Sequence, residues 1–366
     1  MERPNAWLTY SDADMKDLET VAKKYRHFLN VGKTERECIT QIVKEAEEAG
    51  YVSLEEKVKN GEALKAGDKV YQVGMQKIIA LYHIGEEDLA QGMNILCAHI
   101  DSPRLDIKQN PLYEDTDLAY LDTHYYGGVK KYQWVALPMA MHGVIVKKDG
   151  TVVNVTVGED EDDPVLYITD LLIHLAGQQM EKNAAKVIEG ENLDILVGSI
   201  PLEDKEKDAV KEGIIGILKN TYEMEEEDFM SAELEVVPAG RAREMGFDRS
   251  MILGYGQDDK VCALTSLFAM LEAENPERTG CCILADKEEI GNMGATGMQS
   301  SFFEDMVAEV LALTGEDSPV KVRRALRNSC MLSSDVSAAY DPLYPEVFEK
   351  KNTAYFGRGL VLNKYT

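Results

Sequence analysis

Two amphipathic helices are predicted at the start of the chain. Apolar residues recur every three or four positions between Met15 and Leu29, which places them on one helical face. The next stretch opens with Thr34 and Glu37 at the spacing of a capping box, and Gly50 supplies a natural stop. Both segments have the pattern of packing elements rather than of catalytic ones.

Short apolar runs further along the chain predict buried strands. The predicted strands are 70–74, 77–82, 94–99, 281–285 and a strand that starts at 330. Helical periodicity appears at 258–272 and 302–313, between the later strands. Because strands and helices alternate in this way, the pattern predicts an α/β fold.

The middle of the chain has a different, strand-rich pattern. Residues 143–148 and 151–157 alternate around Asp149-Gly150, which predicts a hairpin because both turn residues tolerate positive φ. Further short strands are predicted at 193–200 and 234–237, with a helix at 209–218 between them. We therefore expect residues 111–244 to form a β-rich module inserted into an α/β unit, which is built from residues 1–110 and 245–366.

Composition narrows the classes of function. The 366 residues include 39 Lys and Arg against 65 Asp and Glu, a formal charge of -26, which opposes nonspecific binding to nucleic acid or anionic membranes. No apolar run approaches the roughly 18 residues of a membrane span, and the N-terminus lacks the pattern of a signal peptide. The six cysteines are scattered without C-x-x-C spacing, as in reduced proteins. We expect a cytoplasmic protein.

The first candidate functional residues are His99 and Asp101, which follow the apolar run 94–98 and stand two residues apart. In extended backbone such residues project to one face, so Asp101 can hydrogen-bond one imidazole nitrogen and leave the other for a cation. Taken alone, this pair fits a buried, satisfied histidine at a strand end equally well.

Carboxylates follow the other element boundaries. Glu288 and Glu289 follow one apolar strand, Asp335 follows another, and Asp258 opens a helix. Each has a simple alternative, since paired glutamates decorate exposed loops and an acid at a helix start caps it or favours its dipole. Histidine and carboxylate side chains recur at four element ends, and strand ends gather at one edge of an α/β sheet. Because these side chains bind divalent cations, the pattern favours a metal site. Adjacent glutamates also point in different directions, so one can bind metal while the other acts as a base.

These motifs resemble those of the aspartyl aminopeptidase and aminopeptidase I family of zinc exopeptidases. The matching segments, in order, are His99-Ile100-Asp101-Ser102-Pro103, Asp258-Asp259, Glu288-Glu289-Ile290-Gly291 and Asp335. The resemblance spans essentially the whole chain. It implies a zinc-peptidase-like mixed sheet flanked by helices, interrupted by a β-rich domain that serves assembly into tetrahedral dodecamers.

The resemblance also implies the ligands of two zinc ions, with cobalt or manganese as substitutes. His99 and Asp335 would hold one ion, and Glu289 would hold the other. Asp258 would bridge the two ions. The peptide bond between Asp258 and Asp259 would be cis.

Two further roles follow from the same resemblance. Asp101 would orient His99, and Glu288 would be the general base. The residue pattern alone leaves the roles of these carboxylates open.

The sequence departs from the family pattern in two places. The aspartyl branch carries a histidine where this chain has Asp170, and that histidine reaches a neighbouring subunit's active site, so a preference for acidic substrates does not transfer. No histidine follows His174, although the family has a final metal-binding histidine near its C-terminus. We therefore expect this sequence, which ends in Asn-Lys-Tyr-Thr at 363–366, to be a C-terminally truncated member.

The sequence predicts a metallo-aminopeptidase that removes N-terminal residues from short peptides and self-assembles. Two alternatives stay open. A two-zinc amidohydrolase that deacylates amino acids would use the same ligands, and a non-catalytic assembly subunit would carry a vestigial site. Comparing hydrolysis of a peptide with that of its N-acetylated form distinguishes the aminopeptidase from the amidohydrolase. Measuring zinc content together with turnover distinguishes the aminopeptidase from the non-catalytic subunit.

Overall fold

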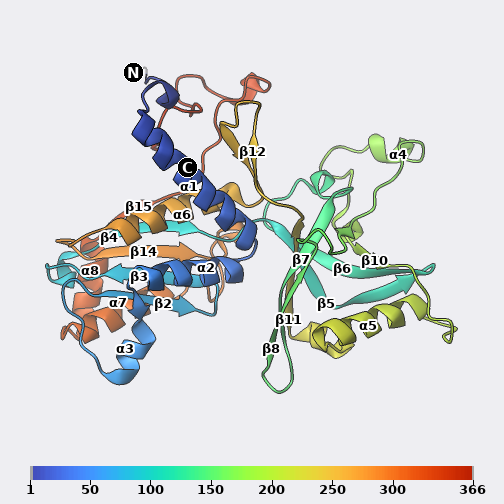
Figure 1. The fold of residues 1–366 in the computed structure, drawn as a ribbon, viewed down its shortest axis with the longest axis horizontal. Helices are drawn as coiled ribbons and strands as arrows, with labels where there is room; N and C mark the ends of the chain where they lie inside the picture. Colours follow the sequence, from blue (N-terminus) through green and yellow to red (C-terminus); the bar gives the residue numbers. More distant parts are fainter. Residues whose placement is uncertain (1–2, 365–366) are drawn as a thin grey trace.

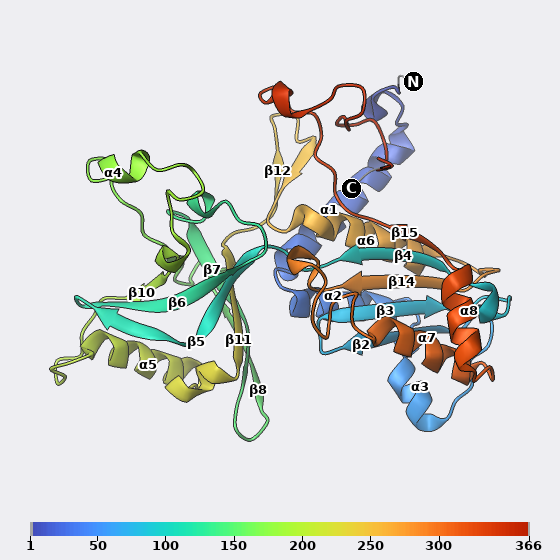
Figure 2. The same ribbon diagram turned by 180° about the vertical axis from the view of Figure 1, so that it is seen from behind.

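The chain folds into two lobes, each built around its own sheet (Figure 1). The computed structural model describes residues 3–364, so Tyr365 and Thr366 of the terminal motif lie outside the described residues. Figure 2 shows the same arrangement from behind, with the second lobe beside the strand ends of the first. Within residues 3–364, no helix is both long enough and apolar enough to cross a membrane.

The helices are α1 (Asp12–Val31), α2 (Glu35–Glu48), α3 (Leu54–Asn60), α4 (Gly177–Met180), α5 (Ala209–Tyr222), α6 (Gln257–Glu272), α7 (Phe302–Leu313) and α8 (Pro319–Asn328). The strands of the first sheet are β1 (Val52–Ser53), β2 (Lys69–Gly74), β3 (Ile78–His83), β4 (Asn94–His99), β14 (Gly280–Ala285) and β15 (Cys330–Ser333). Those of the second sheet are β5 (Arg104–Asp115), β6 (Leu118–Tyr126), β7 (Pro138–Val146), β8 (Val152–Val157), β9 (Leu166–Tyr167), β10 (Ile195–Gly198) and β11 (Ala232–Pro238). A separate hairpin pairs β12 (Arg243–Met245) with β13 (Met251–Leu253).

The first sheet is mixed, with the order β1-β2-β3-β14-β4-β15. β14, β4 and β15 run parallel, whereas β3 runs antiparallel to both β2 and β14. The three parallel strands therefore end at the same edge, where functional groups collect in α/β sheets. His99 is the last residue of β4 and lies in register with Ala285, the last residue of β14.

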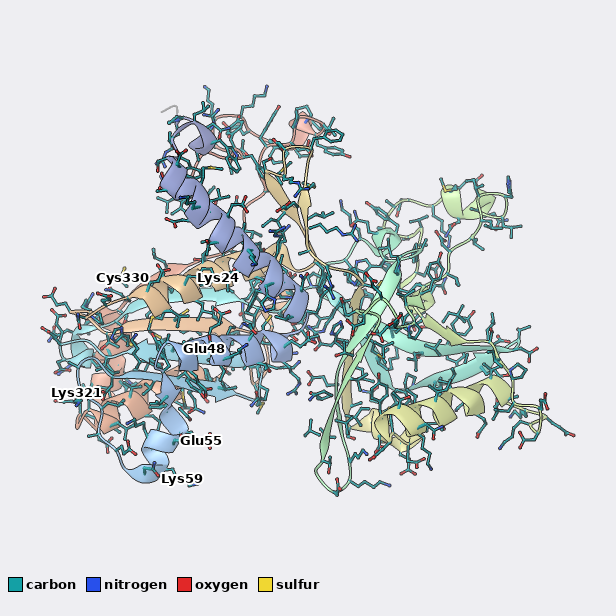
Figure 3. All side chains as sticks on the ribbon, viewed as in Figure 1. Lys24, Glu48, Glu55, Lys59, Lys321 and Cys330 are labelled. Carbon is teal, nitrogen blue, oxygen red and sulfur yellow. The ribbon has the colours of Figure 1, made fainter. Side chains whose placement is uncertain are left out.

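Helices cover both faces of the first sheet. Alternate residues of each strand face opposite sides, so Leu81 and Leu284 pack against α1, α2 and α6, whereas Ala80 and Ile283 pack against α3, α7 and α8. Lys24 of α1, Glu48 of α2 and Glu55 of α3 are exposed on the outer surface (Figure 3). The result is a three-layered α/β unit.

The second sheet closes on itself. Its order is β11-β5-β6-β10-β9-β7-β8, and β11 pairs with β7 as well as with β5. Its interior holds a second apolar core, against which α5 packs through Ile214, Ile215 and Leu218. The division expected at residue 110 falls inside β5, whose pairing lies entirely in this sheet, so the second sheet begins at Arg104.

Several local predictions match the structure. Thr34 and Glu37 form the capping box of α2, because each side chain accepts a hydrogen bond from the other residue's backbone N–H. β7 and β8 form the predicted hairpin, with Gly150 at a φ of +87° in its turn. Helices α3 and α8 were not predicted from the sequence pattern, and both cover the α7 face of the first sheet.

Candidate metal centre

The candidate metal centre lies at the edge where the parallel strands of the first sheet end. His99 closes β4, and Glu288 and Glu289 form the short 3-10 helix η6 (Glu288–Ile290) just after β14. Asp335 follows β15, and Asp258 lies in the first turn of α6. All the residues expected to bind metal are thus brought to one place.

Their donor atoms form three overlapping groups, and within each group all the atoms lie within 4.8 Å of one another. The groups are His99 with Asp258 and Glu289, His99 with Glu288 and Asp335, and Asp258 with Asp259 and Asp335. Since His99 and Asp258 each belong to two groups, the groups merge into one cluster. Glu288, expected to be the base, belongs to the same cluster.

His99 is held on one side and open to carboxylates on the other. Its Nδ1 lies 3.2 Å from Oδ1 of Asp101 and 3.1 Å from the Asp101 carbonyl oxygen. Its Nε2 lies 3.2 Å from Oδ1 of Asp258 and 3.7 Å from Oε2 of Glu288. Nε2 is buried and makes no hydrogen bond within the described residues. The imidazole is therefore oriented by Asp101, and its Nε2 faces the acidic cluster.

Asp101 is fully buried, and its carboxylate accepts three hydrogen bonds besides the contact with His99. Oδ1 accepts from the backbone N–H of Glu288 at 3.2 Å. Oδ2 accepts from the backbone N–H of Glu289 at 3.1 Å and from the Tyr126 hydroxyl at 2.7 Å. Burial opposes the charge of Asp101, but the contacts with His99 and with the Tyr126 hydroxyl outweigh it and hold the pKa of Asp101 below its ordinary value. Asp101 therefore stays an anion that fixes both His99 and η6.

The first turn of α6 departs from helical geometry at Asp258 and Asp259. The peptide bond between them is cis, as expected. Ser102 donates its hydroxyl to the Asp258 carbonyl oxygen at 3.1 Å. Asp259 is fully buried, and neither of its carboxylate oxygens has a hydrogen-bond partner in the described part of the chain. The turn thus carries two carboxylates into the cluster.

The crowding of carboxylates shifts their protonation. Burial, followed by the negative charge of Asp258, raises the pKa of Glu289 to about 7. Burial likewise raises the pKa of Asp259 to about 7 and that of Glu288 above its ordinary value. Like charges held this close favour a compensating positive charge.

A divalent cation fits this donor set. Imidazole nitrogen and carboxylate oxygen are the ligands that zinc and similar ions take, and His99 Nε2 is a buried donor atom without a hydrogen-bond partner in residues 3–364. Polar atoms of this kind need a partner such as an ion. The Asp101 carboxylate behind His99 is the usual support of a metal-binding histidine.

Two residues of the second lobe, Tyr126 and Gly127, contribute to the site although no sequence motif pointed to them. Tyr126, the last residue of β6, reaches Asp101, and Gly127 follows it with a φ of +77°. A Cβ on Gly127 would lie 3.2 Å from Cβ of Glu289, so this glycine lets the end of β6 approach η6. The aromatic and glycine-rich run 125–128 is visible in the sequence, but nothing in it points to Asp101.

Known proteins resemble the chain in sequence over its whole length. A curated relative from Clostridium acetobutylicum, described as a probable M18 family aminopeptidase 1, is 59% identical over 366 residues, which cover 100% of this chain and 79% of the relative. A relative from Thermotoga maritima with the same description is 43% identical over 374 residues, covering 100% of this chain and 79% of the relative.

Solved structures and a family model agree with these relatives. The crystal structure of aminopeptidase I from Clostridium acetobutylicum matches with a TM-score of 0.91 at 58% identity, over 100% of this chain and 79% of that one. An M18 family aminopeptidase from Thermotoga maritima matches with a TM-score of 0.92 at 42% identity, over 98% of this chain and 78% of that one. These matches confirm the predicted α/β fold class and the prediction of a zinc-dependent aminopeptidase. With residues 28–366 matched by the family model described as aminopeptidase I zinc metalloprotease (M18), the chain belongs to that family.

Proposed function

We propose that the cluster around His99 is a two-metal centre that hydrolyses the first peptide bond of short peptides, with Glu288 as the general base. One observation carries the proposal: the buried Nε2 of His99, whose ring is oriented by Asp101, faces carboxylates contributed by three other element ends. Family membership supplies zinc as the metal, and cobalt or manganese are candidate substitutes.

The overlap of the donor groups supports two metal positions. Asp258 belongs both to the group with His99 and Glu289 and to the group with Asp259 and Asp335, which suits a bridging carboxylate. We assign His99 and Asp335, which share the group with Glu288, to one ion and Glu289 to the other, because Asp258 shares a group with each of Asp335 and Glu289. When bound, zinc would supply Lewis acidity, which lowers the pKa of a water molecule and polarises the scissile carbonyl.

Glu288 is placed to handle the proton. Its side chain is 41% exposed, so it can meet a substrate and a water molecule, and its Oε2 lies 3.7 Å from His99 Nε2. The backbone N–H of Glu288 donates to the Asp101 carboxylate, and this hydrogen bond fixes the backbone position from which the Glu288 side chain extends. In the proposed reaction, Glu288 takes the proton of the attacking water and returns it to the leaving amine.

The acidity of the centre favours a substrate with a free α-amino group. An ammonium beside the carboxylates gains favourable charge interactions, which an N-acylated substrate cannot make. The net charge of -26 also favours approach of cationic or neutral peptides over strongly acidic ones.

A comparison of free and N-acetylated aminoacyl amides tests the function. With zinc-loaded chain, we expect hydrolysis of members of a panel of aminoacyl amides, loss of activity with a chelator, and no hydrolysis of the matching N-acetyl amides. Equal hydrolysis of the acetylated forms would instead identify a deacylating amidohydrolase. A zinc-loaded chain without turnover on the whole panel would identify a non-catalytic subunit.

We further propose that the β-rich part, residues 111–244, mediates self-assembly, with a dodecamer as the expected particle and the two flanking parts as the catalytic unit. In support, a loop before α4 exposes several large apolar side chains, namely Leu171, Leu172, Ile173 and Leu175. Exposed apolar patches of this kind mark interaction sites. Replacing Leu172 and Ile173 with Ser should reduce particle size in analytical ultracentrifugation, and an unchanged size would place the contacts elsewhere.

A further inference from the structure

We infer that Tyr126 of the second lobe is a positioning residue for the metal centre: its hydroxyl fixes the Asp101 carboxylate that orients His99. The inference rests on the proposed function of that centre and extends it to a residue outside the first sheet. It makes the second lobe a structural part of the active centre rather than only a surface for assembly.

The contact is direct and buried. The Tyr126 hydroxyl donates to Oδ2 of Asp101 at 2.7 Å, and both side chains are largely shielded from solvent, with exposed fractions of 6% and 0%. Burial, together with the Asp101 charge, raises the pKa of Tyr126 far above its ordinary value, so the hydroxyl keeps its proton and remains a donor.

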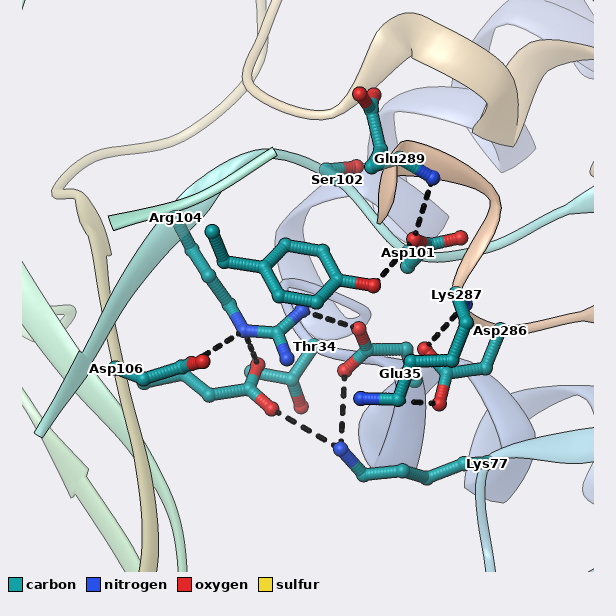
Figure 4. Close-up of polar contacts among 12 residues, drawn as sticks. Thr34, Glu35, Lys77, Asp101, Ser102, Arg104, Asp106, Asp286, Lys287 and Glu289 are labelled. Atoms are coloured by element: carbon teal, nitrogen blue, oxygen red, sulfur yellow. Dashed lines mark hydrogen bonds and ion pairs between the residues drawn. The ribbon is translucent and has the colours of Figure 1, made fainter. Parts of the chain in front are cut away.

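The hydroxyl completes the set of partners around Asp101. Oδ1 lies beside His99 Nδ1 and accepts from the backbone N–H of Glu288. Oδ2 accepts from the Tyr126 hydroxyl and from the backbone N–H of Glu289, and Figure 4 marks the contact between Glu289 and Asp101. A carboxylate rotates about one bond, so its plane is fixed only when both oxygens are held. Because Oδ1 faces His99 Nδ1, the hold on Oδ2 helps to keep the carboxylate in the plane that supports the imidazole.

The tyrosine ring is itself anchored. The Arg104 guanidinium carbon lies 3.8 Å from the ring centroid, a close cation–π contact. Arg104 in turn belongs to a buried charge cluster, which consists of Glu35, Lys77, Arg104 and Glu235. All four are at most 6% exposed, and the cluster joins α2 and the β2–β3 turn of the first lobe to β5 and β11 of the second (Figure 4).

This arrangement links the lobe interface to the metal ligand. Paired buried charges cannot shift without leaving one of them unpaired, which costs several kcal/mol, so the cluster holds Arg104 in place. Arg104 holds the ring, the ring places the hydroxyl, and the hydroxyl sets Asp101. The geometry of His99 therefore depends on the docking of the two lobes.

Replacing Tyr126 with Phe tests the inference, because the ring and its contact with Arg104 remain while the hydroxyl is lost. Zinc affinity is measured on the full chain by competition with a chromophoric chelator. We expect Tyr126→Phe to weaken zinc binding by about 10-fold, as loss of outer-sphere support does for metal-bound histidines. Equal affinity of the wild type and Tyr126→Phe would overturn the inference.

Tyr113→Phe is a matched control. The Tyr113 hydroxyl also donates to a carboxylate of the second lobe, Asp194, at 2.6 Å, but this pair is remote from His99 in the fold and Tyr113 is half-exposed. We expect zinc affinity to be unchanged in Tyr113→Phe. Equal weakening in both variants would show a general effect of losing a hydroxyl and would overturn the inference.

A double variant separates positioning from a merely structural role. If Tyr126 acts through Asp101, adding Tyr126→Phe to Asp101→Asn should weaken zinc binding no further. Additive weakening would overturn the inference, because Tyr126 would then act by another route. A wild-type chain that binds no zinc would overturn the proposed function together with the inference, whereas normal zinc binding by both the wild type and Tyr126→Phe would overturn the inference alone.

Discussion

The imidazole of His142 in β7 bridges two carboxylates at the lobe interface. Its Nδ1 lies 2.8 Å from Oε1 of Glu37 in α2, and its Nε2 lies 3.1 Å from Oε1 of Glu159. Lys33 Nζ lies 3.2 Å from the same Glu159 oxygen. Burial lowers the pKa of His142, but the hydrogen bonds to the two carboxylates outweigh it and raise the pKa to about 9. The imidazole is therefore a cation at neutral pH.

The contacts of His142 with Glu37 and Glu159 predict that the stability of the fold depends on pH. Because the pKa of His142 is raised above its unfolded value of about 6.5, its contribution is fully present below pH ~6.5 and is lost as the pH rises through about 9. Each pKa unit corresponds to about 1.4 kcal/mol, so the contribution is at most about 3 kcal/mol. Urea unfolding should show wild type more stable than His142→Gln at pH 6, with the gap narrowing towards pH 9.5. The exposed His124, changed to Gln, is the control, and a gap that stays constant with pH would contradict the prediction.

Glu288 and Glu289 should respond differently to the same substitution. Glu288→Gln should abolish hydrolysis while zinc content stays near that of the wild type, because the proposed base does not bind metal. Glu289→Gln should lower zinc content, because an amide oxygen is a weaker ligand than a carboxylate. Metal analysis after dialysis, combined with an aminoacyl amide assay, measures both. Joint loss of metal and activity in Glu288→Gln would make Glu288 a ligand.

Asp101→Asn should weaken zinc binding by about 10 to 100-fold. The Asp101 carboxylate only accepts hydrogen bonds, from Glu288, Glu289 and Tyr126. An amide group in its place would turn an N–H towards at least one of these donors and would lose the charge that orients His99. Isothermal titration with zinc measures the change, and unchanged affinity would mean that His99 holds its orientation without Asp101.

The backbone position just before α6 requires a glycine. Gly256 has a φ of +77°, and a Cβ there would lie 2.6 Å from Nζ of the buried Lys260 and 3.0 Å from the Ser102 hydroxyl. Lys260 cannot move freely, because it donates to the Lys33 carbonyl oxygen at 2.9 Å. Gly256→Ala should therefore destabilise the fold by at least about 1 kcal/mol.

Gly216, within α5, is the matched control for that substitution. Apart from the neighbouring backbone of α5, no heavy atom of residues 3–364 lies within 4 Å of a Cβ built on Gly216, and its backbone is helical. Gly216→Ala should stabilise the chain by roughly 0.5–1 kcal/mol, since alanine is the better helix former. Thermal unfolding of both variants should show shifts of opposite sign. Shifts of the same sign would contradict the steric explanation for Gly256.

The sequence predicts which side chains of the candidate centre lie together where those residues stand at the ends of regular elements. His99 and Asp101 meet because residues two apart in extended backbone share a face, and the parallel strands β4, β14 and β15 carry their following residues to one edge. The capping box at Thr34 is equally local. Such features depend on short-range periodicity, which a single sequence displays.

Contacts between lobes are harder to predict, because no local pattern encodes them. Tyr126 reaches Asp101 only through the pairing of β5 with β6, whose tight turn at Thr116 and Asp117 has positive φ at both residues without a glycine to mark it. With that hairpin unrecognised, the expected division at residue 110 fell within β5. The buried charges Glu35 and Glu235 likewise read as surface acids until their cationic partners are known.

The closure of the second sheet limits how copies of the chain can associate. Among the strands of that sheet, β8 alone has a neighbour on one side only, so its outer edge is where a strand from another molecule can be added along the full strand. Contacts elsewhere on this lobe must be made by side chains and loops. A point substitution can change the chemistry of such a contact without altering the fold. Assembly and folding are thus separable traits in this lobe, and particle size can change while the closed sheet stays intact.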